Sequence, residues 1–272
     1  MEKKRVLIVT QEMNPYLIEG EISKVIKNLP QHIQDSGMEI RVLMPRFGSI
    51  NERRHRLHEV VRLSGINIAV DDEDYPLMIK VASLPGARMQ VYFLDNEEFF
   101  KRKSVFADDK EVFFEDNADR MIFFCRGVIE TVKKFGWPPH IIHCHGWMTS
   151  LIPYYLKTAY QDDPVFSNTK VIYSVYENSF DNKLSPTFVK KAQHTGADFK
   201  PFSTADNTGL NLGGAAFADA VIQASATIAD PVKKLLAKSG KPVLGFKEEE
   251  DEYLRDYQLF YQSLLEQPLP IS

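Results

Sequence analysis

The feature that most constrains the fold is a strand, a helix and a second strand within the first 45 residues. Residues 5–10, RVLIVT, form a short β-branched apolar run of the kind buried inside a parallel sheet. Apolar side chains then recur at helical spacing over residues 22–33, and EIRVLMP at 39–45 is a second strand. Such a βαβ unit is parallel and right-handed, and ligands bind beyond the carboxyl ends of its strands. We therefore expect a site near residues 13–24.

Strands and helices continue to alternate after this unit. Residues 56–95 are rich in β-formers and include two strands joined by a Pro85–Gly86 turn. Residues 116–136 form an amphipathic helix that ends at a glycine. Three further core strands are expected at residues 140–145, 170–176 and 219–225. This order predicts a doubly wound α/β domain, with a mainly parallel, Rossmann-like sheet, over residues 1–245.

The tail, residues 246–272, is predicted to be a short linker followed by one amphipathic helix over about 249–266. Acidic residues 248–252 suit the start of a helix, and Pro268 would stop it. An apolar stripe of this kind must be covered. We expect it to dock on the α/β domain near the end of the last strand and helix, through Tyr253, Tyr257, Phe260, Tyr261 and Leu264.

The amino-acid composition narrows the classes of function that we expect for this chain. The chain has 272 residues, of which 44% are hydrophobic and 26% charged, with a net charge of −4. This balance provides no bulk attraction to nucleic acid or to an acidic membrane, and no apolar run approaches the length of a membrane span. The N-terminus shows no secretory signal. Cys125 and Cys144 lie in apolar runs, which fits reduced, buried thiols, so we expect a cytoplasmic protein.

The stretch HIIHCHGWMTS combines a strand end with a helix start. His143 and His145 share one face of the strand and either border a cleft or are hydrogen-bonded histidines at the sheet edge. A third ligand at a fixed spacing is not evident, so no metal site is predicted. Cys144 is expected to be a buried structural thiol. The glycine-rich residues 209–220 precede a strand, so they predict a small-residue helix packed on the sheet and not a phosphate-binding turn.

The turn after the first strand, PYLIEGEIS, has the position of a phosphate-binding corner. Its single glycine, Gly20, stands between Glu19 and Glu21. A phosphate needs close backbone N–H groups and nearby positive charge, which this corner does not supply.

Several segments together resemble one family, the bacterial glycogen synthases and plant starch synthases. These are ADP-glucose-dependent glucosyltransferases built from two Rossmann-like domains, the GT-B type. RVLIVTQEMNPYLIEGEISKVIKNLP, EIRVLMPRFG, VYFLDNEEFF, DNADRMIFFCRGVIE, IIHCHGWMTSLIPYYLK and ADAVIQAS resemble the family's N-terminal domain in order and spacing, over about residues 3–240. The terminal helix resembles the family's last helix, which crosses back onto the first domain. The resemblance implies a single GT-B half without the domain that carries most of the nucleotide pocket.

Departures from the family pattern fall at functional positions. Ile18 stands where the family has a donor-loop lysine, and Glu21 replaces the second glycine of a pair. Gly146 replaces the aspartate before the tryptophan, and Tyr176–Glu177 replace His–Asn. A carboxylate about 4 Å from a phosphate costs roughly 4 kcal/mol at an effective dielectric near 20. We therefore expect loss of ADP-glucose binding, no catalytic residue, and no cofactor.

The resemblance implies a glycosyltransferase domain with a glucan-facing or regulatory role in glycogen metabolism. Two alternatives stay open: half of a transferase completed by a separate donor-domain chain, or a protein-interaction module that uses the exposed cleft face. The expected partner is accordingly an α-glucan or a protein. The candidate cleft and sugar-binding residues are Gly20, Glu21, His145, Trp147, Tyr176 and Glu177.

Overall fold

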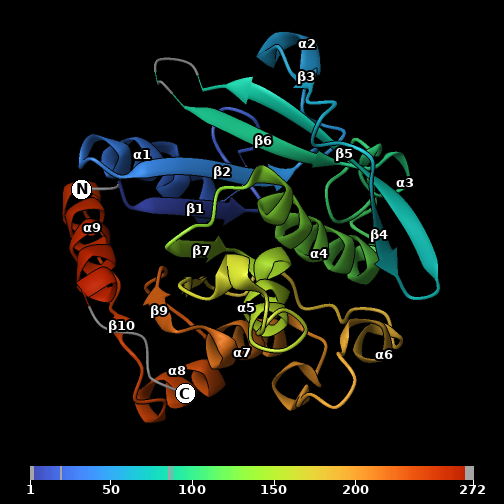
Figure 1. Ribbon diagram of the computed structural model, residues 1–272. Coiled ribbons are helices and arrows are strands. Elements are labelled where there is room, and N and C mark those ends of the chain that lie inside the picture. The colour runs from blue at the N-terminus through green and yellow to red at the C-terminus, as the bar shows by residue number, and fades with distance from the viewer. Residues whose placement is uncertain (1–2, 19, 85–86, 88, 267–272) are drawn as a thin grey trace.

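A computed structural model describes residues 3–18, 20–84, 87 and 89–266 of the chain. Its centre is one mixed sheet in the order β10-β9-β8-β7-β1-β2-β6-β5-β3, with β4 paired to β5 (Figure 1). The strands are β1 Arg5–Thr10, β2 Glu39–Pro45, β3 His58–Glu59, β4 Ile66–Val70, β5 Glu73–Ser83, β6 Gln90–Asp95, β7 Ile141–His145, β8 Lys170–Val175, β9 Ala220–Gln223 and β10 Val243–Leu244.

Helices cover both faces of this sheet. The longer ones are α1 Glu21–Asp35, α4 Asn117–Phe135, α7 Asn207–Phe217, α8 Asp230–Lys238 and α9 Glu250–Glu266. The short ones are α2 Glu52–His55, α3 Glu97–Phe100, α5 Leu151–Leu156, α6 Phe188–Ala192, and the 3-10 turns Trp147–Thr149, Pro164–Phe166 and Lys200–Phe202. Helices α4, α5 and α7 form one layer, whereas α1 and α9 pack against each other in another (Figure 1). The predicted doubly wound α/β fold is confirmed.

The strands from β10 to β6 are parallel throughout, as the apolar runs indicated. Strand β1 lies between β7 and β2 at the centre of the sheet, and Val6, Leu7, Ile8 and Val9 have no exposed surface. Burial on both faces explains why this strand is apolar at consecutive positions and does not alternate. The position also brings the turn after β1 to the middle of the carboxyl edge, where a ligand is expected.

The remaining strands form an antiparallel margin. Strands β5 and β6 are the two predicted from residues 77–96, and they pair antiparallel from Met78–Asp95 to Ser83–Gln90. The Pro85–Gly86 turn predicted between them lies outside the described residues. Strands β3 and β4 extend the β-rich region and pair with β5 on its other edge.

Helix α7 contains the glycine pair of the predicted small-residue helix. A Cβ atom at Gly214 would lie 2.7 Å from the ring of Tyr173 on β8, so only glycine allows this helix to approach the sheet so closely. The interpretation of this segment as a packed helix, and not a phosphate-binding turn, is confirmed.

Helix α9 begins and ends within a residue of the predicted bounds, while Pro268 lies outside the described residues. Leu254, Tyr257, Tyr261 and Leu264 are buried, and two of the predicted docking residues, Tyr253 and Phe260, are only half-buried. The predicted docking site, near the end of the last strand and helix, covers only part of the surface that α9 contacts. The helix contacts β10, but it also packs on α1, and Tyr261 reaches β7.

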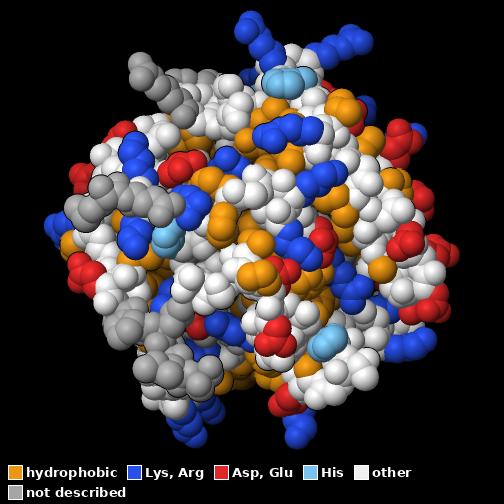
Figure 2. Space-filling model, viewed as in Figure 1, with side chains coloured by type: hydrophobic (Ala, Val, Ile, Leu, Met, Phe, Trp, Pro, Cys, Tyr) orange, Lys and Arg blue, Asp and Glu red, His pale blue; other side chains and the backbone are white. Residues whose placement is uncertain are grey.

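The length of α9 explains this wider contact. Seventeen helical residues span about 25 Å, whereas three strand spacings from β10 to β7 cover only about 14 Å. A helix that begins near the edge of the sheet therefore extends over its centre. None of the described helices is long and apolar enough to cross a membrane. On the face shown in Figure 2, positive and negative side chains are interspersed over most of the surface.

Candidate functional site

The carboxyl ends of β1, β7 and β8 border a pocket of about 300 Å³, here called the strand-end pocket. It lies where open parallel sheets bind their ligands. Its lining comes from the loops after these strands and from the starts of α1 and α7. The lining residues are Gln11, Glu12, Gly20, Glu21, Ile22, Gly146, Trp147, Tyr176, Glu177, Asn178, Ser179, Asn207 and Asn211.

The structure brings the six predicted site residues together at this edge. Five of them line the pocket, namely Gly20, Glu21, Trp147, Tyr176 and Glu177. His145 does not line it. That imidazole has no exposed surface, and its Nδ1 atom lies 2.8 Å from the hydroxyl oxygen of Tyr176. His145 therefore supports the pocket through Tyr176 and does not face a ligand there.

The turn after β1 is held by carboxylates. The backbone N–H of Gly20 donates to Oε2 of Glu12 over 2.8 Å. The hydroxyl of Ser225, just beyond β9, donates to Oε2 of Glu21, and its oxygen accepts the N–H of Glu177 over 2.9 Å. Glu21 thus ties the start of α1 to the β9 end of the sheet. Glu19, the other acid predicted at this corner, lies outside the described residues.

The charged side chains among the described lining residues of the pocket are all acidic. Glu12, Glu21 and Glu177 line it, and no lysine or arginine appears among its described lining residues. Lys24, the nearest lysine along α1, lines a different cavity. A pocket of this kind disfavours an anion, while carboxylates and side-chain amides can accept and donate hydrogen bonds to a neutral hydroxyl-rich ligand.

Trp147 is packed between the strand-end pocket and a neighbouring cavity. Its indole has 3% of its surface exposed, and its ring centroid lies 4.9 Å from that of Phe106 and 5.1 Å from that of Phe180. It lines both the strand-end pocket and a neighbouring cavity of about 400 Å³, which shares Glu12 and Gly20 with that pocket. The tryptophan therefore offers little exposed surface to either space.

His143 lies deeper than His145 and is part of a hydrogen-bonded core. Its Nδ1 atom lies 2.5 Å from the hydroxyl of Tyr261, and its Nε2 atom lies 2.7 Å from Oγ of Ser174. Burial, with His145 as a like-charged neighbour, holds the pKa of His143 well below its usual range. The predicted alternative of a cleft-facing His143 is therefore wrong, because α9 covers it.

Burial also lowers the pKa of His145, to about 3, so both imidazoles are neutral near pH 7. The Nε2 atom of His145 is buried and makes no hydrogen bond within the described part of the chain. The ring centroids of His143 and His145 lie 3.8 Å apart. No group of three metal-ligating side chains occurs among the described residues, so this histidine pair stands without a third ligand.

Gly146 follows β7 with a left-handed φ of +88°. A Cβ atom there would overlap with the carboxamide of Gln11, whose oxygen accepts the N–H of Met148 over 3.2 Å. A side chain at this position would have to displace the carboxamide of Gln11 and adopt a left-handed φ that favours glycine, whereas the resembled family has aspartate there.

The chain's relatives agree with this architecture. Residues 5–244 match the family described as the starch synthase catalytic domain. The chain belongs to the glycogen and starch synthase family. A glycogen synthase of Chlorobium limicola is 35% identical over 230 residues, which cover 84% of this chain and 47% of that protein. A glycogen synthase of Chlorobium chlorochromatii is 40% identical over 177 residues, or 63% of this chain and 35% of its own length.

A solved structure supports the fold. The catalytic domain of starch synthase IV from Arabidopsis thaliana, bound to ADP and acarbose, aligns with a TM-score of 0.73 at 19% identity. The alignment covers 90% of this chain and 51% of that one. This synthase-family chain therefore has a Rossmann-like, GT-B-type fold, and it spans 35–47% of the length of the curated relatives it matches.

Sequence reasoning missed several polar residues of the synthase-family pocket. Glu12 and Ser225 anchor the corner, and Asn211 lies on α7 opposite Tyr176. Glu12 lies two residues after one predicted core strand and Ser225 is the last residue of another, so their position at a carboxyl end was a usable signal. Asn211 carried no such signal, because only the packing of α7 brings it to the pocket.

Proposed function

We propose that this synthase-family domain binds an α-glucan in the strand-end pocket and does not by itself transfer glucose from ADP-glucose. The observation that carries the proposal is the charge of the pocket, which is lined by three carboxylates and, among the described residues, by no cation. The role that follows is glucan-facing or regulatory within glycogen metabolism.

Electrostatic repulsion disfavours a sugar nucleotide at this corner. Glu21 is exposed and begins α1, so its carboxylate stands where a diphosphate would approach the helix N-terminus. Two unit charges 4 Å apart repel by about 1 kcal/mol in water and about 4 kcal/mol at an effective dielectric of 20. Ile18, at the position of the family lysine, is 63% exposed and brings no compensating charge.

The same lining residues suit a neutral glucan that is rich in hydroxyl groups. Carboxylates of Glu12 and Glu177 can accept hydrogen bonds from sugar hydroxyls, and the amides of Asn178, Asn207 and Asn211 can do both. A volume near 300 Å³ is at the lower end of small-molecule sites, which suits one or two sugar units of a longer chain.

The test compares ligands by thermal shift. A ligand that binds only the folded state at 100 times its Kd stabilises it by about 2.7 kcal/mol, so maltoheptaose is expected to raise the Tm and ADP-glucose to leave it unchanged. Glu177→Ala should reduce the maltoheptaose shift. Transfer of radiolabelled glucose from ADP-glucose to glycogen by the pure chain would overturn the proposal.

A companion variant tests the cause. Ile18→Lys with Glu21→Gly is expected to raise the affinity for ADP by at least roughly tenfold, because it adds a cation and removes an anion at the corner. Val61→Lys, at a position 78% exposed in another loop, is the control for added charge. A chain that gains transfer activity only with a separate donor-domain chain would support the split transferase. No shift with any glucan would favour the protein-interaction module.

A further inference from the structure

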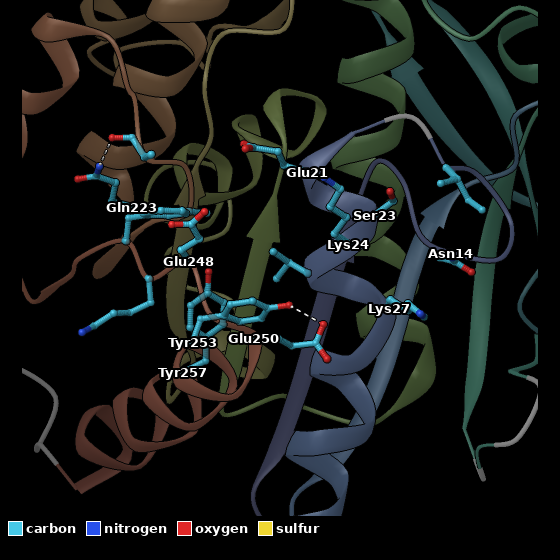
Figure 3. Close-up of a pocket in the computed structure, with 16 residues that line it drawn as sticks. Asn14, Glu21, Ser23, Lys24, Lys27, Gln223, Glu248, Glu250, Tyr253 and Tyr257 are labelled. Atoms are coloured by element: carbon cyan, nitrogen blue, oxygen red, sulfur yellow. Dashed lines mark hydrogen bonds between the residues drawn. The ribbon is translucent and has the colours of Figure 1, made fainter.

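A cavity of about 310 Å³ lies where strand β4 meets helix α4 and the segment that follows α5. We call it the α4–β4 cavity. It shares no lining residue with the strand-end pocket. The cavity between α1 and α9 that Figure 3 shows, by contrast, shares Glu21 with that pocket and lies in the other layer of helices. The α4–β4 cavity is therefore a separate site.

Arg126 and Glu130 bring opposite charges to this cavity from successive turns of α4. Residues four apart lie about 6 Å along a helix and on one face, where arginine and glutamate commonly pair. Here the guanidinium of Arg126 donates through Nη1 to the carbonyl of Ala69 over 2.6 Å, and Glu130 accepts from Lys133 over 3.3 Å. Within the described part of the chain no ion pair joins Arg126 to an acid, so the cavity keeps a cation and an anion beside one another.

A buried hydroxyl adds a hydrogen-bond donor near the guanidinium. Tyr155 lines the cavity with 1% of its surface exposed, and its hydroxyl has no hydrogen-bond partner among the described residues. The guanidinium carbon of Arg126 lies 5.3 Å from the centroid of this ring. Burial raises the pKa of Tyr155, against a smaller opposing effect of the Arg126 charge, so the phenol stays protonated near pH 7. A buried polar group without a partner is costly, and this one points to an acceptor on a ligand.

The opposite end of the cavity is negative. Burial and, after it, the charge of Glu130 raise the pKa of Tyr160, so these two side chains lie close together. Lys133, the partner of Glu130, is partly exposed and does not line the cavity. A positively charged group of a ligand can therefore meet the Glu130 carboxylate inside the cavity.

The remaining wall is largely apolar and is held by contacts distant in sequence. Strand β4 supplies Ile66 and Ile68, and Ala159 lies in the segment after α5. His194, from the segment after α6, completes the lining, and its backbone N–H donates to the hydroxyl of Tyr154 over 2.8 Å. A volume near 310 Å³ is at the lower end of small-molecule sites, so it suits one small molecule with an apolar part.

We propose that the α4–β4 cavity binds one free α-amino acid with an apolar side chain. The ligand's carboxylate lies on Arg126 and accepts from the hydroxyl of Tyr155, while its ammonium group donates to Glu130. Its side chain packs against the isoleucines of β4. Charge-assisted hydrogen bonds of about 2.8 Å at each end, with one carbon between the ligand's two charged groups, match side-chain charges one helical turn apart.

The experiment is a calorimetric titration of the full chain with L-leucine. Leucinamide lacks the carboxylate and isocaproate lacks the ammonium group, so each is expected to bind at least about tenfold more weakly than L-leucine. Equal affinity for either analogue overturns the inference, because the cavity would then recognise only one of the two charges. It is also overturned if neither L-leucine nor L-phenylalanine binds at millimolar concentration.

Two substitutions locate the binding within the chain. Arg126→Gln is expected to weaken L-leucine binding by at least about tenfold, and Tyr155→Phe to weaken it several-fold. Tyr155→Phe should keep the Tm of the parent, because the hydroxyl makes no contact that folding would lose. Lys134→Gln is the matched control, since it removes the same charge from α4 outside the cavity, where Lys134 donates to the carbonyl of Ser64 over 3.0 Å. Binding that both Arg126→Gln and Tyr155→Phe leave unchanged places the amino acid elsewhere and refutes the assignment.

Discussion

The hydroxyl group of Tyr261 is predicted to hold α9 on the sheet. It lies 2.5 Å from Nδ1 of His143, at the centre of the sheet and with no exposed surface on either side chain. Substitution Tyr261→Phe removes this one oxygen and keeps the ring. The change therefore isolates a polar contact between the end of the chain and its central strand.

The expected loss of stability follows from the buried polar atom that the substitution leaves without a partner. His143 would keep its contact with Ser174 but lose the partner of Nδ1, and a buried polar atom without a partner costs about 1–3 kcal/mol. The retained ring leaves almost no cavity. For a domain of this size each kcal/mol lowers the Tm by about 2–4 °C.

Urea unfolding at pH 7, followed by circular dichroism, measures the free energy of unfolding. Tyr253→Phe is the matched control, because its hydroxyl contacts Glu250 at an exposed position over 3.2 Å and should change stability by less than about 0.5 kcal/mol. The slope with urea should stay constant in both variants. Equal stability of Tyr261→Phe and Tyr253→Phe would refute the reasoning.

Three further outcomes are expected. Burial depresses the pKa of His143 and lowers that of His145 to about 3, whereas a histidine in the unfolded chain has a pKa of about 6.5. The unfolded state therefore binds more protons, and the folded state loses stability as the pH falls below about 6.5. The loss from His145 should reach about 2 kcal/mol at pH 5, with His143 acting in the same direction, and a flat urea profile from pH 5 to 8 would contradict it. Gly146→Ala should destabilise by at least about 2 kcal/mol, through left-handed strain and overlap with Gln11, as urea midpoints will test. Cys144 is buried with a raised thiol pKa, so iodoacetamide should not label it until the protein unfolds, and rapid labelling of the folded chain would exclude this account.

Most of the fold was predictable from local pattern. The runs at 5–10 and 39–45 contain consecutive apolar residues, at positions 6–9 and 42–44, because both faces of those strands are covered, and this signal needs no knowledge of the neighbours. Helix α4 was equally clear, since its buried stripe and the left-handed glycine at its end coincide.

The candidate site was less predictable, because its geometry depends on contacts distant in sequence. Nothing local shows that Gln11 fills the space beside Gly146, or that Ser225 meets Glu21 across 204 positions. The burial of His143 likewise depends on where α9 docks. Residue type and strand position placed the candidate residues at the carboxyl edge of the sheet, whereas packing decided which of them line the strand-end pocket.

The contact between His143 and Tyr261 also has a consequence for protein synthesis. The two residues are 118 positions apart, so at about 5–20 residues per second a ribosome needs roughly 6–24 seconds to add the second after the first. During that interval β1, β7 and β8 can already be paired, but α9 has not yet been made to cover His143. The nascent chain therefore carries an uncovered sheet face that its own later residues must close, and a pause in translation before residue 250 would prolong its exposure to chaperones and to other nascent chains.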